Sequence, residues 1–454
     1  MNFLGSNYLL SNKTAEKLYQ EVEDLPIVDA HNHGDVREIV ENKGWSDIWE
    51  LEGATDHYVW ELMRKRGVPE EKVTGDASNK EKWLALAEVF PSFAGNPTYE
   101  WIHLDLKRRF GIDKLISAET ASEIWDKTRA MLKEDKMKPQ NLLKEMKVEI
   151  MCTTDSPLSE LEYHQRAREE IEGVKILPTW RPDRAVNLEK EGWKDFVQKL
   201  GIKEEQDTSA LSGFLKALKK AHRKFARMGC VASDHGLEQL ISYYVSEERA
   251  GEIYQKALNE QELNIEEIND FKAFMLICLI EMNEKENWIT QLHIGAVRDF
   301  RNSLYETLGP DSGGDISRQD LNLVDNLKYL LNHFDGKVNF VLYCLDPTHL
   351  PTLATISRAY PNLTVGAPWW FNDSPVGMIE HLKYVATVDL LSNQVGMVTD
   401  SRKLISYGSR TEMYRRALCD VTGAMVERGQ MPLKVAQKLV SDLSYYRPLK
   451  YFFK

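Results

Sequence analysis

The sequence predicts an α/β protein whose strands close into a (β/α)8 barrel of the TIM type. Eight short apolar segments rich in β-branched residues alternate with segments of helical periodicity along the 454 residues. Most of these short segments are continuously apolar, which is typical of parallel strands covered on both faces. Alternating strands and helices form βαβ units, and eight such units can close a barrel. An open doubly wound sheet is the alternative architecture.

The eight predicted strands are spread unevenly along the chain, at residues 26–31, 148–154, 175–180, 230–235, 288–294, 339–345, 363–370 and 395–400. A crossover between parallel strands needs only about a dozen residues, yet residues 32–147 separate the first two strands. This interval carries several helical patterns, so we expect residues 34–147 to form a helical insertion over the barrel mouth. Because no internal repeat or low-complexity linker divides the chain, residues 1–454 are predicted to form a single barrel with insertions.

The charge balance excludes several kinds of partner. Lys and Arg total 58 against 70 Asp and Glu, which gives a formal net charge of −12. Nucleic acids and anionic membranes require a basic face, so neither is expected as a partner. The most apolar stretch, residues 271–280, is too short to span a bilayer and is predicted to be a buried helix.

The cysteines and the N-terminus indicate the compartment. The five cysteines are widely scattered and form no C-x-x-C pair, so neither a disulfide framework nor a thiolate zinc site is predicted. The N-terminal segment lacks a basic region followed by an apolar core, so it does not read as a signal peptide. We therefore expect a cytoplasmic protein with reduced thiols. The sequence does not determine the oligomeric state, and a homo-oligomer is one of the possibilities.

The ends of the first and eighth predicted strands carry candidate metal ligands. The first strand ends in Asp-Ala-His-Asn-His, and residues two apart in a strand face the same way, so His31 and His33 can bind one divalent ion together. The eighth strand ends in Val-Thr-Asp-Ser-Arg, where Asp400 can supply an oxygen ligand or cap the following helix. Because the first and eighth strands are neighbours in a closed barrel, we expect these three side chains to converge on one metal ion.

Two further strand ends carry polar residues that can reach the same cavity. His293 lies in Gln-Leu-His-Ile-Gly of the fifth strand and is either a functional residue or a hydrogen-bonded core histidine. The fourth strand ends in Ser-Asp-His-Gly, and only one of Asp234 and His235 can face inward.

Three arginines near strand ends predict an anionic substrate, because a guanidinium binds a carboxylate through two parallel hydrogen bonds. Arg181 follows the third strand, Arg298 the fifth and Arg402 the eighth, and surface salt bridges are the alternative, above all for Arg298. Trp369 and Trp370 end the seventh strand, where an aromatic face can pack against a sugar or cap the core.

The ordered motifs PIVDAHNH, DHYVWELMRKRGV, LLKEMKVEIMCTTDSP, PTWRPD, QLHIGAVRD, PWWFND and MVTDSR resemble those of the uronate isomerases of the amidohydrolase superfamily. The resemblance extends from about residue 4 to the C-terminus. It implies the barrel with a helical insertion after the first strand, and one divalent metal ion, usually zinc, on His31, His33 and Asp400. It also implies the interconversion of D-glucuronate with D-fructuronate and of D-galacturonate with D-tagaturonate.

The resemblance also assigns residues to the hexuronate substrate. The pair His57 and Tyr58, which the residue pattern alone gives as ordinary helix positions, matches a family pair that reaches the substrate. Substrate contacts are likewise implied for Arg181, His293, Arg402 and one of the two tryptophans, and we add Arg298 and Asp234 as candidate substrate-binding residues. Two positions depart from the family pattern, Asn32 between the metal histidines and the segment Gly-Ser-Arg-Thr-Glu at 408–412.

These residues suggest a mechanism and two rivals. Asp400 would take a hydroxyl proton and Tyr58, supported by a neighbouring histidine, would carry the C2 proton to C1; His57 and His293 complete the candidate catalytic set. The fourth strand lacks the lysine, and the sixth the histidine, of two-metal amidohydrolases, so a mononuclear site is expected. A metal-dependent hydrolase on the same barrel and a non-catalytic sugar-acid binding protein are the alternatives.

Overall fold

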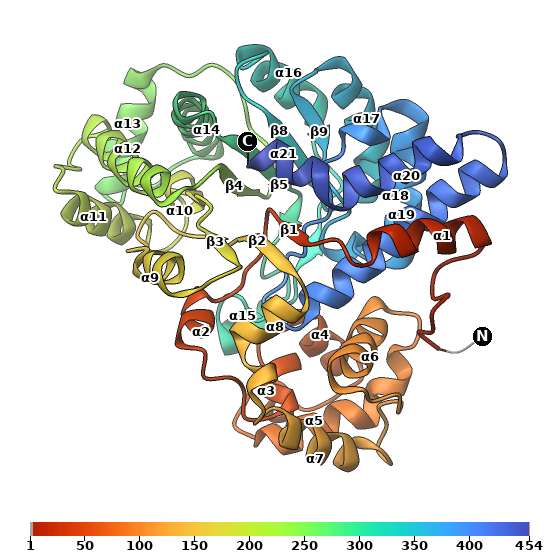
Figure 1. Ribbon diagram of the computed structural model, residues 1–454. Coiled ribbons are helices and arrows are strands. Elements are labelled where there is room, and N and C mark those ends of the chain that lie inside the picture. The colour runs from red at the N-terminus through yellow and green to blue at the C-terminus, as the bar shows by residue number, and fades with distance from the viewer. Residues whose placement is uncertain (1–2, 454) are drawn as a thin grey trace.

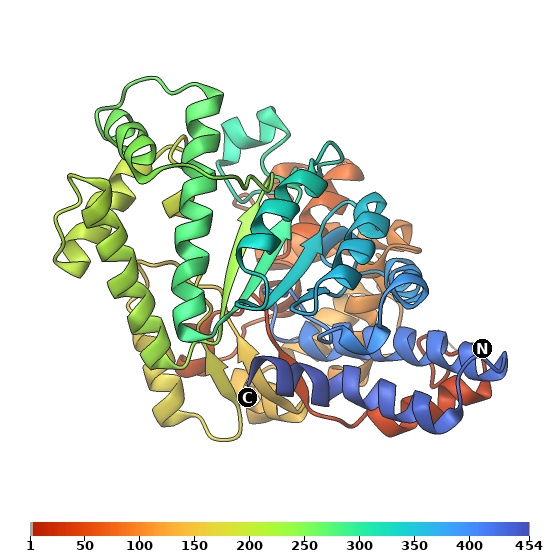
Figure 2. The ribbon, with the colours of Figure 1, turned by 90° about the horizontal axis from the view of Figure 1, so that it is seen from above.

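The computed structural model describes residues 3–453 and has parallel strands at its centre with helices around them (Figures 1 and 2). Seven of the eight predicted segments contain a strand in the described part of the chain. Their bounds are β1 Ile27–Asp29, β2 Val148–Cys152, β3 Lys175–Leu177, β4 Ala232–Leu237, β5 Ile289–Ile294, β8 Phe340–Cys344 and β9 Leu363–Val365. The predicted α/β class is confirmed.

The strands pair in the order expected for a barrel. One parallel sheet runs β1-β2-β3 and another runs β4-β5-β8-β9. Single bridges from Trp180 to Asp155 and to Ser233 join the two sheets across the third and fourth strand positions. A short antiparallel pair, β6 Ala296–Val297 and β7 Ile316–Ser317, follows β5 and was not predicted.

The eighth predicted strand, residues 395–400, is not assigned as a strand. Its backbone has positive φ at both ends, +82° at Gly396 and +48° at Asp400, so little extended chain lies between. It nevertheless lies beside the first strand, because the Asp400 N–H donates to the His31 carbonyl at 3.2 Å and the Thr399 N–H donates to the Asp29 carboxylate at 3.0 Å. The Asp29 side chain of β1 thus accepts a backbone hydrogen bond that a strand neighbour would otherwise accept through its carbonyl.

The helices that follow the strands have the amphipathic patterns seen in the sequence. They include α9 Glu162–Glu170, α12 Leu211–Met228, α13 Glu247–Leu258, α14 Ile265–Glu286, α16 Leu323–His333, α17 Leu350–Ala359 and α18 Pro375–Val388. Helix α12 ends at Gly229, whose φ of +91° is the left-handed conformation that glycine adopts at helix ends. The apolar segment 271–280 lies within α14, as predicted, and no helix among residues 3–453 has the length and apolar character needed to cross a bilayer.

The interval between β1 and β2 is helical. It contains α2 Val36–Glu41, α3 Ile48–Glu52, α4 His57–Lys65, α5 Asn79–Val89, α6 Pro97–Phe110, α7 Ala121–Met131 and α8 Pro139–Glu145, which gather to one side of the strands in Figure 1. One hydrophobic cluster joins Trp83 and Ile102 of this interval to Ile27 of β1 and Val148 of β2. These helices therefore share a core with the strands.

The two ends of the chain pack together. Helix α1 Lys13–Val22 lies against α19 Ser406–Glu427 and α20 Leu433–Ser441 (Figure 1). Helix α19 also contacts α6 and α18, so it connects the N-terminal helix, the helical interval and the barrel.

Candidate active site

His31, His33 and Asp400 come together where the first and eighth segments end. The Nε2 atoms of His31 and His33 each lie 3.1 Å from the same oxygen, Oδ1 of Asp400. His31 is 1% exposed, whereas His33 and Asp400 are 27% and 18% exposed. The predicted convergence of these three side chains is therefore present, with one buried ligand and two that face a cavity.

The local fold explains why Asp400 reaches the histidines. Its left-handed backbone turns the chain directly after the extended segment, and the Trp369 indole N–H donates to its second oxygen, Oδ2, at 2.8 Å. Burial opposes ionisation of Asp400, but hydrogen bonds with His31 and His33 outweigh it and hold its pKa well below the usual range. Asp400 is therefore an anion held in one orientation by three neighbours.

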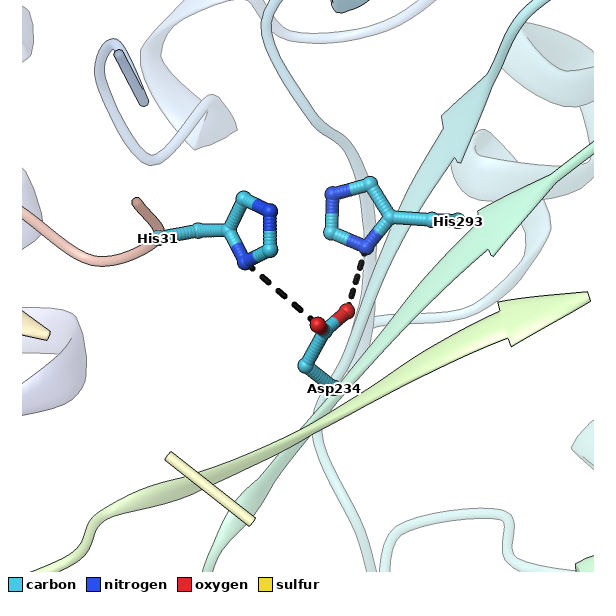
Figure 3. Close-up of side chains that lie close together, drawn as sticks. All are labelled: His31, Asp234 and His293. Carbon is cyan, nitrogen blue, oxygen red and sulfur yellow. Dashed lines mark hydrogen bonds and ion pairs between the residues drawn. The ribbon is translucent and has the colours of Figure 1, made fainter. Parts of the chain in front are cut away.

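A second group of ligand-type side chains shares His31. Asp234 lies between His31 and His293, with its oxygens 3.6 Å from His31 Nδ1 and 2.6 Å from His293 Nδ1 (Figure 3). Asp234 is 0% exposed and also accepts a hydrogen bond from Arg181 at 3.0 Å. Of the two alternatives at the end of the fourth strand, Asp234 thus reaches this cluster, whereas His235 hydrogen bonds to Ser233.

His293 is buried among aromatic rings. It stacks on Tyr343 with ring centroids 4.4 Å apart and an interplanar angle of 3°, and it meets the Trp369 ring edge-on at 4.6 Å. Burial lowers the pKa of His293 to about 4, against the opposing charge of Asp234. A neutral His293 that donates its Nδ1 proton to Asp234 has an unprotonated Nε2. No hydrogen-bond partner for this buried nitrogen is present among the described residues.

The donor set fits one divalent metal ion. The Nε2 atoms of His31 and His33 each lie 3.1 Å from Asp400 Oδ1, close to the spacing of about 3.4 Å between ligands of a tetrahedral ion with metal–ligand bonds of about 2.1 Å. Two imidazole nitrogens and one carboxylate oxygen suit several divalent transition metals, so the chemistry of the ligands does not select one of them.

The three predicted arginines differ in how far their charges are already satisfied. Arg181 donates to Asp183 at 2.7 Å and to Asp234 at 3.0 Å. Arg298 pairs with Asp315 at 3.0 Å and lies over the Trp370 ring, 4.3 Å from its centroid. Arg402 meets no carboxylate oxygen closer than 3.8 Å in the described residues, so it has the most freedom to bind an anion.

Two cavities divide the candidate substrate residues. One is lined by His33, His57, Tyr58, Asp400 and Arg402, together with Trp370 and Arg298. The other, of about 450 Å3, is lined by Arg181, His293, Trp369 and again Arg298. The structure thus brings the predicted residues to one of these two cavities, except the buried His31 and Asp234, which line neither.

His57 and Tyr58 reach the first cavity because helix α4 begins there. Asp56 caps this helix by accepting the Tyr58 N–H at 2.9 Å. Arg402 donates to His57 Nε2 at 3.1 Å, so this nitrogen must be unprotonated. Burial and the adjacent Arg402 charge lower the pKa of His57 to about 4, in agreement with that hydrogen bond.

Sequence reasoning missed three buried charged residues at the first cavity, two of which, Lys403 and Arg410, line it. Tyr58 donates to Asp373, not to a neighbouring histidine as expected, and Asp373 pairs with Arg410. Lys403 lies 2.8 Å from Asp56 and 3.0 Å from Glu52, with Lys403 only 3% exposed. The sequence motifs contained Asp373 in PWWFND and Arg410 in GSRTE, yet only the packing of α19 and the insertion shows what they contact.

Comparisons with known proteins agree with this arrangement. A model of the glucuronate isomerase family matches residues 1–452. A uronate isomerase from Thermotoga sp. (strain RQ2) is 63% identical over 452 residues and covers 100% of both chains. The crystal structure of uronate isomerase from Thermotoga maritima has a TM-score of 0.98 at 62% identity, covering 100% of each chain. That of glucuronate isomerase from Caulobacter crescentus has a TM-score of 0.95 at 28% identity, covering 99% and 96%.

The fold and the polar residues at the strand ends define a (β/α)8-barrel enzyme of the amidohydrolase type with a site suited to a metal ion. The chain belongs to the glucuronate isomerase family. It is an aldose–ketose isomerase that acts on a uronate, and the hydrolase and non-catalytic alternatives are not favoured.

Proposed function

We propose that the enzyme interconverts D-glucuronate with D-fructuronate, and D-galacturonate with D-tagaturonate, with one zinc ion on His31, His33 and Asp400. The observation that carries this proposal is the meeting of two imidazole Nε2 atoms on one carboxylate oxygen at 3.1 Å. When bound, the ion supplies a Lewis acid that polarises a substrate oxygen.

Asp234 and His293 support this site without forming a second one. The Asp234 charge is already balanced by Arg181, and its carboxylate lies 3.6 Å from the far nitrogen of His31. A carboxylate that reaches this nitrogen of a ligating histidine fixes the ring and its tautomer. We therefore assign Asp234 a positioning role in place of the substrate contact expected from the sequence. His293 remains a candidate contact through its free Nε2.

The substrate carboxylate is assigned to Arg402, with Arg298 in the same cavity and Arg181 in the neighbouring one. Arg402 is 37% exposed and lies next to Asp400, so a uronate bound by both would have its carboxylate on the cation and its hydroxyl near the anion. The Trp370 ring, which carries Arg298 on its face, offers an apolar surface for the sugar C–H groups. The helical interval 34–147 acts in this scheme as a cover that delivers His57 and Tyr58.

Proton transfer is assigned to the chain's own residues. Asp400 stays ionised, so it can accept the O2 hydroxyl proton and return it to O1 of the enediol. Tyr58 lines the same cavity and is assigned the transfer between C2 and C1. His57, held neutral by Arg402, keeps that guanidinium directed at the substrate carboxylate.

The test combines turnover with metal analysis. Asp400→Asn and Tyr58→Phe are assayed with glucuronate and galacturonate, and bound metal is quantified for each variant. We expect Tyr58→Phe to retain metal and lose turnover, because only the hydroxyl is removed, and Asp400→Asn to lose both. Near-wild-type turnover in both variants would refute the assignment, and a metal other than zinc giving the higher activity would refute the choice of ion.

A further inference from the structure

A buried hydrogen-bonded cluster lies beside Tyr58, next to the cavity that contains Asp400. The Tyr58 hydroxyl donates to both oxygens of Asp373, at 3.0 and 3.1 Å. Arg410, from α19, donates to one of these oxygens at 2.7 Å, and both members of this ion pair are 3% exposed. Three segments far apart in the sequence thus meet in one cluster, the start of α4, the turn after β9 and α19.

The direction of the hydrogen bond determines what Tyr58 can do. An ionised carboxylate only accepts, so the Tyr58 proton is directed at Asp373 and the lone pairs of its oxygen stay available. Tyr58 also lines the cavity that contains Asp400 and Arg402. Its oxygen can therefore accept a proton from the cavity only if its own proton passes to Asp373.

The charges around the cluster suit such a transfer. Burial raises the pKa of Tyr58 well above its usual value, so it does not ionise by itself. Burial also raises the pKa of Asp373 to about 7, although Arg410 opposes this. The other charges that act on the cluster are Asp400, and Asp56 at the start of α4, while the Trp101 ring of α6 lies 3.9 Å from the Arg410 guanidinium carbon.

We propose that Asp373 is a positioning residue that receives the Tyr58 proton while Tyr58 receives the C2 proton of the uronate, with Arg410 holding Asp373 in place. The inference rests on the proposed role of Tyr58. In the forward step the C2–H bond breaks and its proton forms the new O–H bond of Tyr58, whose original proton moves to the Asp373 carboxylate. The C2 electron pair forms the C1=C2 bond and the C1=O π pair moves to O1. O1 takes the O2 proton through Asp400, which leaves an enediolate with its charge on O2.

The second half returns every proton. Asp373 gives its proton back to Tyr58, Tyr58 delivers its proton to C1, and the O2 charge of the enediolate forms the C2 carbonyl of the ketose. Asp373 and Tyr58 end in their starting states, so no co-reactant is consumed. Arg410 remains charged throughout because a guanidinium does not deprotonate in proteins.

The experiment is a mutant cycle on the metal-loaded enzyme with Asp373→Asn, Tyr58→Phe and the double variant. General acid–base groups contribute about 100-fold or more, so we expect Asp373→Asn to lower kcat by about that factor with little change in KM and metal content. Because both groups act in one relay, the double variant should be no slower than Tyr58→Phe alone. The acid limb of the kcat–pH profile should also disappear in Asp373→Asn.

A conservative variant and a matched control separate the relay from a structural role. Asp373→Glu keeps a carboxylate beside Arg410 and should recover part of kcat and the acid limb, even if Asp373→Asn folds poorly. Asp346→Asn removes another buried carboxylate after a neighbouring strand, one that contacts Thr348 and not Tyr58, and should leave the pH profile unchanged. Wild-type kcat and an intact acid limb in folded Asp373→Asn would overturn the inference while Tyr58→Phe still tests the proposed function.

Discussion

Replacing Trp369 with phenylalanine tests how the metal ligand Asp400 is held. The Trp369 indole N–H donates to Asp400 Oδ2 at 2.8 Å, while Oδ1 faces both histidines. Phenylalanine keeps an aromatic ring against His293 and removes the N–H donor together with part of the indole. Loss of a hydrogen bond to a charged group costs about 1.5–3 kcal/mol, and partners of metal ligands typically contribute about 10–100-fold in affinity or activity. We therefore expect metal affinity to fall by about 10–100-fold.

The assay is a competition titration of metal-free protein with a chelator of known affinity, followed by turnover at saturating metal. Trp370→Phe is the matched control, because the neighbouring tryptophan contacts Arg298 and Phe371 and forms no hydrogen bond with Asp400 in the described structure. The control should change KM for the uronate and leave metal affinity as it is. Equal metal affinity in Trp369→Phe and the wild type would refute the reasoning that this indole fixes the carboxylate.

Two further predictions concern stability. Lys403→Met leaves two buried carboxylates without their cation, which costs about 3–5 kcal/mol and lowers Tm by about 3–5 °C for a chain of this length. Calorimetry should show almost no change for Lys438→Met, whose ion pair is on the surface, and equal midpoints for both variants would contradict this account. His103 accepts the Ile116 N–H at 2.9 Å, which requires an unprotonated Nε2, and burial lowers its pKa to about 4. Because the unfolded histidine titrates near pH 6.5, the free energy of unfolding should decrease from about pH 6.5 to 4 by up to ~1.4 kcal/mol per unit. His103→Gln should flatten that slope in denaturant titrations, and an unchanged slope would rule the histidine out.

The metal triad could be predicted from the sequence because its information is local. Two histidines two residues apart at one strand end, and one carboxylate at the end of the neighbouring strand, need only the strand order to come together. The eighth strand itself was overpredicted, since its apolar residues say nothing about the positive φ of Gly396 and Asp400. The segment still lies beside β1 as predicted, because the Asp29 carboxylate accepts a hydrogen bond from the Thr399 backbone N–H.

The roles of adjacent residues could not be separated in this way. Trp369 and Trp370 are equal in the sequence, but a φ of +51° at Trp370 turns the chain, so that one ring meets Asp400 and the other meets Arg298. Asp373 and Arg410 are 37 residues apart in the sequence, and only the packing of α19 brings them together beside Tyr58. Contacts of this kind depend on helix placement, which no local pattern encodes.

The loop at 400–403 connects the metal site to the helical interval 34–147. Asp400 meets the two histidines, Arg402 donates to His57 and Lys403 pairs with Asp56. Asp56 in turn caps α4 and so fixes the start of the helix that carries Tyr58. Three residues of this loop thus connect the metal ligands to the proposed proton carrier, so we expect a change in the loop to alter metal binding and proton transfer together.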